Sequence, residues 1–276
     1  MSVGKSDKEL AFLHDLYVAT DWGERFAELV DEHVKLPAKG RVLCVAAGTG
    51  SHALALKKRA GRDVTVVGVD ESPERIELAR AKSGMLKLDD QVEFCSTQLE
   101  TLALEDEQFD LVVGDASMVA AERLPEMLAE MARVTAPGGT VALNVSTASS
   151  FGEFFSIYWE ALCATNLAEY APAVEDLINE LPTVSEVEDL ARYEGLSEVR
   201  SWTNKEEFDY ATGEEFINAP LVNDFLLGQW LAPLPDEEAR ERASSEITRI
   251  INEERHDADF VFSIKATLVV GNKAER

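Results

Sequence analysis

The hydrophobic residues at the start of the chain recur every three or four positions. They are Leu10, Leu13, Leu16, Tyr17, Phe26, Leu29 and Val30, and a proline follows at position 37. This spacing places apolar side chains on one face of a helix. We therefore expect residues 1–39 to form a helical segment.

From Gly40 onward, short runs rich in β-branched residues alternate with amphipathic stretches. The expected strands are residues 41–45, 64–69, 92–95, 109–113 and 140–145, and helices are expected to end near residues 60, 82 and 134. Ser72 and Pro73 are typical of a helix start, and Gly84 of a helix end. Strands that alternate with helices predict a parallel sheet wound by helices on both faces.

After residue 145 the alternation gives way to helical patterns. An aromatic-rich helix is expected over residues 154–162, and two more helices before residue 193 complete what we interpret as an inserted cap. Strand texture returns around residues 199–210. The chain ends on a strict alternation of apolar positions, namely Phe260, Phe262, Ile264, Ala266, Leu268 and Val270. This alternation predicts a long strand that is half-buried on one face.

These patterns divide the chain into four segments. Residues 1–39 are the N-terminal helical segment, 40–147 the strand-and-helix core, 148–196 the helical cap and 197–276 the part that completes the sheet. Hydrophobic residues make up 46% of the 276 positions, which is enough for a large buried core.

Charge and cysteine usage exclude several classes of protein. The chain has 52 acidic and 26 basic residues, and no stretch gathers Lys and Arg into a stripe, so nucleic acid and anionic membranes are poor partners. Its three cysteines are scattered and form no C-x-x-C pair, so neither a disulfide framework nor a metal site is expected. The sequence has no signal-peptide pattern and no run of about 18 apolar residues, which favours a cytoplasmic protein.

The candidate chemistry begins where the strand 41–45 runs through Ala46–Ser51 directly into a helix. Small residues let the backbone turn sharply and let a ligand approach its amides. Asp70 stands twenty residues after Gly50 at the tip of the next strand, where a carboxylate can accept both hydroxyls of a ribose. Together they predict an adenosine-like ligand. The loop also satisfies the loose dinucleotide pattern, which leaves NAD open.

Five segments between Gly40 and Val145 match the motifs of one family in order and spacing. They are the loop 46–50, the strand end at Asp70, and residues 92–99, 109–115 and 133–140. On these motifs the chain resembles the class I methyltransferases that depend on S-adenosylmethionine (SAM). The resemblance implies a three-layer, Rossmann-like α/β sandwich. Its seven-stranded sheet would be mostly parallel, with an antiparallel last strand and a helical cap insertion.

The resemblance also implies SAM as the cofactor. The implied cofactor-binding residues are Ala46, Gly48, Thr49, Gly50, Asp70, Glu71, Gln98, Leu99, Gly114 and Asp115. Ala46, Gly48 and Gly50 of the loop would pack against the methionine part and the adenosine of SAM, and Asp70 would hold the ribose. Gln98 and Leu99 would lie against adenine. Gly114 and Asp115, at the end of the fourth strand, would face the methionine moiety.

Two positions depart from the family pattern. Cys44 stands where the family usually has an acidic residue, and Gln98 where it usually has aspartate. Cys44 therefore offers no carboxylate for the ligand's amine, whereas Gln98 can still accept a hydrogen bond through its carbonyl. The sequence therefore leaves two possibilities open: that this protein binds SAM weakly, or that it is a relative that does not catalyse methyl transfer.

No side chain declares a catalytic role, because transfer from a sulfonium mainly requires an acceptor held close and in line. We interpret His52 as a helix-surface histidine. His14 and Tyr17 lie in a segment that often covers the cofactor in similar enzymes. Asp115 and Ser117 follow a strand end, where open α/β sheets bind ligands, yet either could simply cap a turn.

The sequence thus predicts SAM-dependent methyl transfer to a small-molecule acceptor by in-line displacement. The cap, with Phe155, Tyr158 and Trp159, is the candidate acceptor site, although these aromatics could equally pack the cap onto the sheet. Residues 202–216 resemble the corresponding region of the quinone-biosynthesis type. Two alternatives stay open: a non-catalytic SAM- or nucleotide-binding regulatory or interaction protein, and an NAD-linked oxidoreductase.

Overall fold

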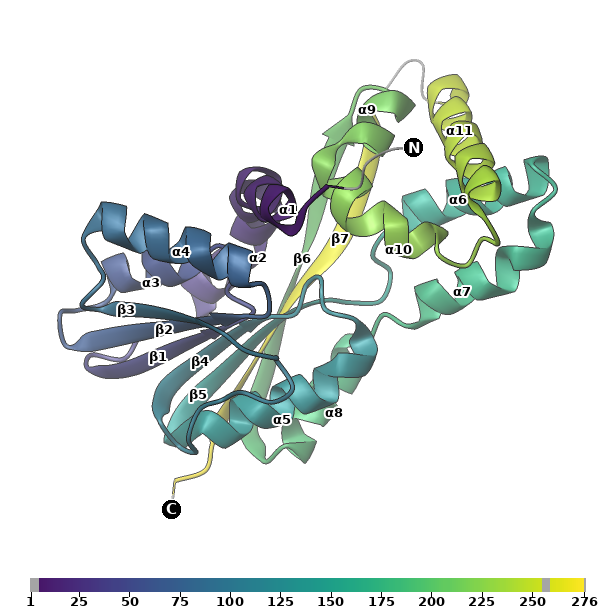
Figure 1. The fold of residues 1–276 in the computed structure, drawn as a ribbon. Coiled ribbons are helices and arrows are strands. Elements are labelled where there is room, and N and C mark those ends of the chain that lie inside the picture. The colour runs from purple at the N-terminus through teal and green to yellow at the C-terminus, as the bar shows by residue number, and fades with distance from the viewer. Residues whose placement is uncertain (1–4, 255–258, 276) are drawn as a thin grey trace. The chain divides into compact units, whose positions relative to one another are not determined.

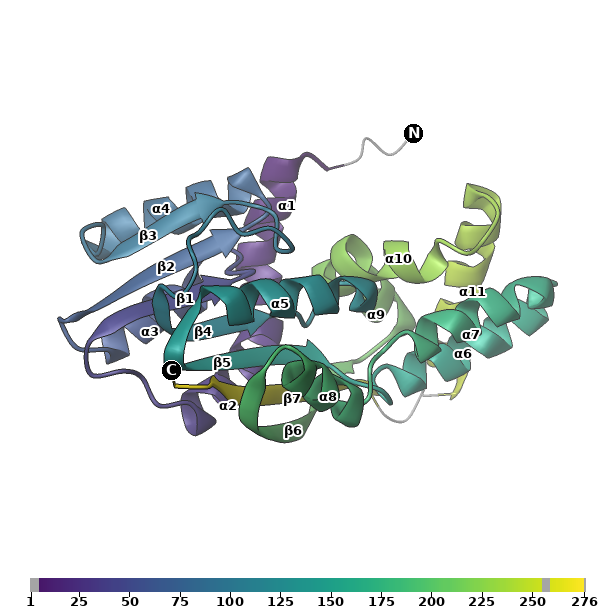
Figure 2. The same cartoon turned by 90° about the horizontal axis from the view of Figure 1, so that it is seen from below.

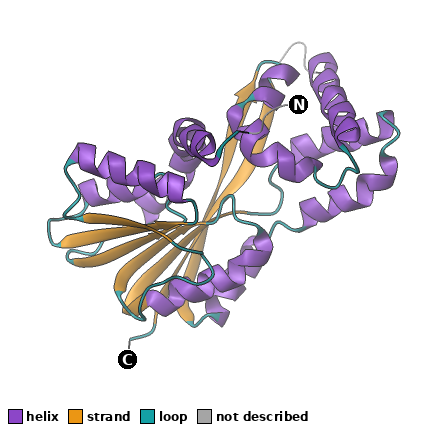
Figure 3. Ribbon diagram, in the orientation of Figure 1, coloured by secondary structure: helices purple, strands orange, loops and turns teal. Residues whose placement is uncertain are grey.

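A computed structural model describes residues 5–254 and 259–275, which contain one seven-stranded sheet (Figures 1 and 3). The strands are β1 Gly40–Val45, β2 Val64–Asp70, β3 Val92–Ser96, β4 Phe109–Asp115, β5 Thr135–Ser146, β6 Leu196–Tyr210 and β7 Phe260–Lys273. Their order across the sheet is β3-β2-β1-β4-β5-β7-β6. The pairs from β3 to β5 are parallel, and β7 runs antiparallel to β5. The predicted mostly parallel sheet with an antiparallel last strand is confirmed.

Contacts divide the chain into two compact units, of which the first holds most of the sheet. Its described residues lie within 5–146, 183–203 and 266–275. Its helices are α1 Asp7–Leu13, the π-helix His14–Trp22, α2 Gly23–His33, α3 Ser51–Arg59, α4 Pro73–Leu86, the 3-10 turn Ala121–Arg123, α5 Leu124–Val134 and α8 Val184–Tyr193.

Helices cover both faces of the sheet in this unit. Figure 2 shows α5 and α8 together on one face, and α3 and α4 lie on the other (Figure 1). The apolar stripe of α5 is buried, since Met127 and Met131 pack in one cluster with Leu43 of β1 and Val187 of α8. This burial is the main source of the unit's stability, because apolar area removed from water contributes about 25 cal/mol per Å².

The helix α4 confirms its predicted start and corrects its predicted end. The Ser72 side chain accepts a hydrogen bond from the N–H of Arg75, and a proline occupies the first turn. Gly84 does not end the helix. It stays helical, and Lys87 instead adopts the left-handed conformation with φ of 58° and donates its N–H to the carbonyl of Gly84. The hydrogen bond from Lys87 to Gly84 therefore outweighs the usual preference for glycine at a left-handed helix end.

The second unit comprises residues 147–182 and 204–265 where the structure describes them. Its helices are α6 Gly152–Ala164, the 3-10 turn Ala168–Tyr170, α7 Ala171–Asn179, α9 Gly213–Asn218, the π-helix Val222–Leu226, α10 Leu227–Leu231 and α11 Glu237–Glu254. Its core is aromatic, with Phe154 4.4 Å from Trp230 and Phe216 4.9 Å from Phe260 between ring centroids. The helix α8, expected in the cap, belongs by its contacts to the first unit.

The last strand is buried more completely than its alternation predicted. Phe262 and Leu268 are buried as expected, but so are Ser263, Thr267 and Val269, which alternate with them. The expectation of a strand buried on one face is wrong. The physical reason is that this second face is also covered, since Val269 packs in the cluster that α5 and α8 complete and Oγ of Ser263 donates to the carboxylate of Glu153 on α6.

Among the described residues, no helix is both long and apolar enough to span a lipid bilayer.

Candidate functional site

The carboxyl ends of β1, β2 and β4 meet at one edge of the sheet, where the glycine loop leaves β1 and enters α3 (Figure 1). Ala46, Gly48 and Gly50 have φ angles of 55°, 55° and 78°, which lie in the left-handed region. The N–H of Ala47 donates to the carbonyl of Val69 at 2.8 Å. The loop therefore turns back sharply and is fastened to the end of β2.

Protein neighbours fill the space beside both loop glycines. A Cβ at Gly48 would lie 2.8 Å from Cε1 of His14, and one at Gly50 would lie 2.7 Å from Cζ of Phe94. Such contacts are too short for any side chain, so each position requires glycine for close packing as well as for its positive φ. The sequence predicted small residues in order to admit a ligand, and the structure adds this second reason.

Asp70 is the buried carboxylate of the site. Its side chain is 5% exposed, Oδ2 accepts the N–H of Gly48 at 2.8 Å, and Oδ1 accepts the N–H of Ser72 at 3.0 Å. A carboxylate has about four acceptor positions, so these two bonds leave capacity for the two hydroxyls of a ribose. Asp70 thus keeps the acceptor capacity that ribose hydroxyls require.

The residues next to Asp70 have other partners. The Glu71 carboxylate turns to Arg123, with Nη2 2.6 Å from Oε1, and Arg123 also pairs with Glu100. Gln98 is exposed in the loop after β3, whereas Leu99 is 3% exposed and packs in the core. Sequence reasoning missed Arg123, because its partners stand 52 and 23 positions away and no local pattern announces them.

Gly114 and Asp115 end β4 beside the loop. Asp115 Oδ1 accepts the N–H of Ser117 at 3.0 Å. Burial raises the pKa of Asp115 above its usual value, although the hydrogen bonds from Ser117 and the proximity of His52 oppose the rise. A Cβ at Gly114 would lie 2.7 Å from Sδ of Met131, so α5 fills the space beside that α-carbon.

Two further groups near the loop are held neutral. His52 is half-buried, and its Nε2 lies 3.4 Å from Oδ1 of Asp31. Burial lowers the pKa of His52 to about 4 despite the opposing charge of Asp115, although the side chain, in the first turn of α3, is still 24% exposed. Burial also raises the pKa of the Cys44 thiol to about 12. Cys44 therefore brings no charge to the position where the family pattern has an acid.

The N-terminal segment contacts the loop and the end of β4. Besides the His14 ring beside Gly48, the hydroxyl of Thr49 donates to Oδ1 of Asp15. Nε1 of Trp22 donates to Oγ of Ser117 at 2.8 Å. His14, Asp15 and Trp22 belong to the π-helix that follows α1, and π-helical turns are often found at functional sites. Tyr17, on the same element, is 45% exposed.

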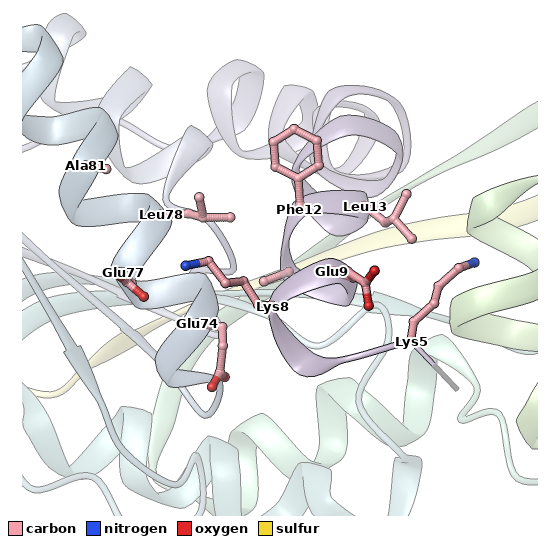
Figure 4. Close-up of a pocket in the computed structure, with 10 residues that line it drawn as sticks. Lys5, Lys8, Glu9, Phe12, Leu13, Glu74, Glu77, Leu78 and Ala81 are labelled. Carbon is pink, nitrogen blue, oxygen red and sulfur yellow. The ribbon is translucent and has the colours of Figure 1, made fainter. Parts of the chain in front are cut away.

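A cavity of about 550 Å³ lies between α1 and α4 (Figure 4). Phe12 and Leu13 of α1 and Leu78 and Ala81 of α4 contribute to its lining, together with charged residues such as Lys8 and Glu77. None of the predicted cofactor-binding residues lines it. The cavity is therefore a feature of the helical layer and not of the glycine loop.

Comparison with known proteins identifies the family. Residues 42–139 match the family described as "Methyltransferase domain". A demethylmenaquinone methyltransferase of Deinococcus radiodurans is 32% identical over 173 residues, which cover 59% of this chain and 70% of that protein. The methyltransferase GfsG of Streptomyces halstedii is 29% identical over 147 residues, and the match spans only about half of each protein, 53% of this chain and 52% of GfsG.

The fold agrees with this assignment. The structure of Haemonchus contortus phosphoethanolamine N-methyltransferase 2 in complex with S-adenosyl-L-methionine superposes with a TM-score of 0.58 and 16% identity, covering 99% of this chain and 59% of that one. The chain belongs to the class I SAM-dependent methyltransferases, as its motifs predicted, and the family's cofactor is SAM.

Proposed function

We propose that this protein transfers a methyl group from SAM to a small, partly apolar acceptor of quinone type. The observation that carries the proposal is Asp70, a buried carboxylate that holds the glycine loop and retains acceptor capacity for a ribose. The acceptor class is supported by the similarity to a demethylmenaquinone methyltransferase. Membership of the family alone does not specify an acceptor.

When bound, SAM supplies a methyl group already activated on a sulfonium sulfur. The chain's own residues would then bind SAM and position it against the acceptor. Asp70 would accept the ribose hydroxyls, and Asp115 at the end of β4 would face the methionine moiety. His14 and Trp22 would exclude water from above the loop. No general base is required of the chain unless the acceptor is protonated at the working pH.

The second unit is the proposed acceptor-binding cap. Phe155 packs 5.8 Å from Trp230 between ring centroids, and Tyr158 is fully buried, so both belong to the interior of this unit. Trp159 is 43% exposed on the same helix. Of the three predicted aromatics, Trp159 therefore offers the accessible ring for an aromatic acceptor, whereas Phe155 and Tyr158 pack the unit itself.

A second candidate is a protein that binds SAM without transferring its methyl group. One observation favours it. Cys44 is a buried, neutral thiol in the position where the family pattern has an acid, so the ligand's amine would lack a charged partner there. Weak binding or a purely structural use of the ligand would follow.

Calorimetric titration with SAM, S-adenosylhomocysteine and NAD tests the cofactor. We expect micromolar SAM binding that falls at least about tenfold in Asp70→Ala, because a hydrogen bond to a charged group contributes roughly 1.5–3 kcal/mol. Asp90→Ala removes an exposed aspartate and serves as the matched control. Tight binding of NAD without any binding of SAM would overturn the proposal.

Turnover separates the two candidates. The wild-type protein is incubated with SAM and a series of demethylated quinones, and methylated product is followed by mass spectrometry. Product formation that is lost in Asp70→Ala supports methyl transfer. SAM binding without product from any quinone-type acceptor contradicts the proposed reaction and favours the second candidate.

A further inference from the structure

The large apolar side chains that stay exposed are concentrated on two neighbouring elements. Of the seven such side chains in the described part of the chain, five belong to the N-terminal helical segment or to α4, namely Phe12, Leu16, Tyr17, Met85 and Leu86. The helices α1 and α4 pack against each other. Apolar surface gathered in one place marks an interaction site, whereas single exposed apolar residues are ordinary.

The cavity between α1 and α4 lies on the same two elements (Figure 4). Among the residues that line it, Phe12 and Ala81 are exposed, so the cavity opens to water. Its volume of about 550 Å³ is large enough to accept apolar side chains of a partner. Filling it would be favourable, because each Å² of apolar surface removed from water contributes about 25 cal/mol.

One face of α4 carries both this hollow and an apolar side chain that can fill such a hollow. Leu78, Ala81 and Met85 stand at positions i, i+3 and i+7, which share one face of an α-helix. Leu78 and Ala81 line the cavity, whereas Met85, about one turn further on, lies outside it and is 83% exposed. Methionine is flexible and fills irregular apolar gaps well.

The charges around the cavity are close to balanced. Its lining includes two lysines and three glutamates, namely Lys5, Lys8, Glu9, Glu74 and Glu77. The whole chain, in contrast, has 52 acidic and 26 basic residues, and its formal net charge is −26. Two copies of such a chain repel each other over most of their surfaces. The face around the cavity is one where this repulsion is weak.

We propose that this face is the interface of a homodimer. A second copy packs its α4 antiparallel to the first, about a twofold axis that passes near Ala81. In an antiparallel pair centred between positions 81 and 82, position 85 of one copy faces position 78 of the other, so each Met85 enters the other copy's cavity. The small side chain of Ala81 lets the two helices approach closely. A twofold interface needs such a self-complementary patch.

Sedimentation velocity of the full chain between about 1 and 100 µM tests the association. We expect the mean mass to approach twice the chain mass of 30.4 kDa as the concentration rises. Met85→Glu should weaken the association at least about tenfold, because the twofold axis brings two carboxylates into apolar cavities. Circular dichroism verifies that the variant is folded, which its exposed position favours.

Tyr193→Glu is the matched control, since Tyr193 on α8 is 86% exposed and does not line the cavity. This variant should associate like the wild type. A wild-type chain that keeps its single-chain mass at every concentration would overturn the proposal. So would a Met85→Glu protein that associates as strongly as the wild type, or a dimer that only Tyr193→Glu weakens.

Disulfide crosslinking tests the register of the two helices. Ala81→Cys is made together with Cys163→Ser, which removes an exposed native thiol. Near the twofold axis the two introduced thiols lie side by side, within the roughly 4.4–6.8 Å between α-carbons that a disulfide spans. Mild oxidation should therefore join two copies, whereas Tyr193→Cys in the same background should not crosslink. A dimer that forms no crosslink through position 81 contradicts the proposed packing.

The homodimer goes beyond the proposed function and does not depend on it. None of the predicted cofactor-binding residues lines the cavity, and the mass measurements need no SAM. A single chain that binds SAM and transfers its methyl group would contradict the homodimer alone. A homodimer that binds no SAM would contradict the proposed function alone.

Discussion

His14 and His52 are two histidines that the fold holds in the neutral form. Burial lowers the pKa of His14 to about 3, helped by the positive charges of Arg75 and Lys82 and opposed by Asp15. Burial lowers the pKa of His52 to about 4. Neither ring can therefore act as a cation near the loop at neutral pH, and protonating either one favours the unfolded chain.

The stability of the protein should consequently fall in mild acid. An unfolded histidine titrates near pH 6.5, so between pH 7.5 and 5.5 the unfolded state gains a proton that the folded state does not. We expect a loss of about 1.4 kcal/mol per histidine over this interval, measured by urea unfolding at the two pH values. The double variant His14→Gln/His52→Gln should show a flatter pH dependence. An equal drop in that variant would contradict the assignment.

At the scale of elements, the joint between α5 and β5 depends on a distant lysine. Nζ of Lys273, near the end of β7, donates to the carbonyls of Ala132 and Thr135 at 2.9 Å each and to that of Arg133 at 3.3 Å. A cation at these carbonyls satisfies acceptors that a helix end leaves unpaired and also suits the helix dipole. Lys273 thus ties the last strand to the helix that covers the sheet.

Removing this contact should loosen the joint. We expect Lys273→Met to lower the free energy of unfolding by about 1–2 kcal/mol, because hydrogen bonds to a charged group are lost while the aliphatic stem is kept. Chemical denaturation measures the change. Lys58→Met, at an exposed position in the last turn of α3, is the control and should change stability by less than about 0.5 kcal/mol. Equal effects of the two variants would rule out the contact as a source of stability.

At the scale of the whole molecule, the excess of acidic residues opposes the compact state. The formal net charge is −26, and like charges repel one another more in the folded chain than in the expanded one. Individual ion pairs such as Arg133 with Glu130 offset this only locally. Salt screens the long-range repulsion, since the Debye length shrinks from about 30 Å at 0.01 M to about 3 Å at 1 M ionic strength.

The melting temperature should therefore rise with sodium chloride between 10 mM and 1 M at pH 7.5. Scanning calorimetry measures it. The rise should be smaller at pH 5.5, where the net charge is closer to zero because the isoelectric point is about 4.5. A melting temperature that falls with salt would mean that attractive ion pairs outweigh the repulsion.

Features that depend on neighbours along the chain were predictable from the amino-acid sequence. Strand and helix periodicity fixed the order of elements, and the loop 46–50 with Asp70 marked the candidate site, because turns, caps and strand ends are set by local residues. The prediction from local residues was wrong at Gly84, because α4 continues past this glycine to Leu86 and ends with Lys87 as its C-cap.

The distant residues that complete the site are set by tertiary packing. His14 lies beside Gly48, and Asp15 pairs with Lys82, although the paired residues stand 34 and 67 positions apart. The burial of both faces of β7 likewise follows from the helices that pack on it, such as α5 and α8 against Val269. Such contacts are set by how elements pack, and periodicity along the chain carries no information about which elements become neighbours in space.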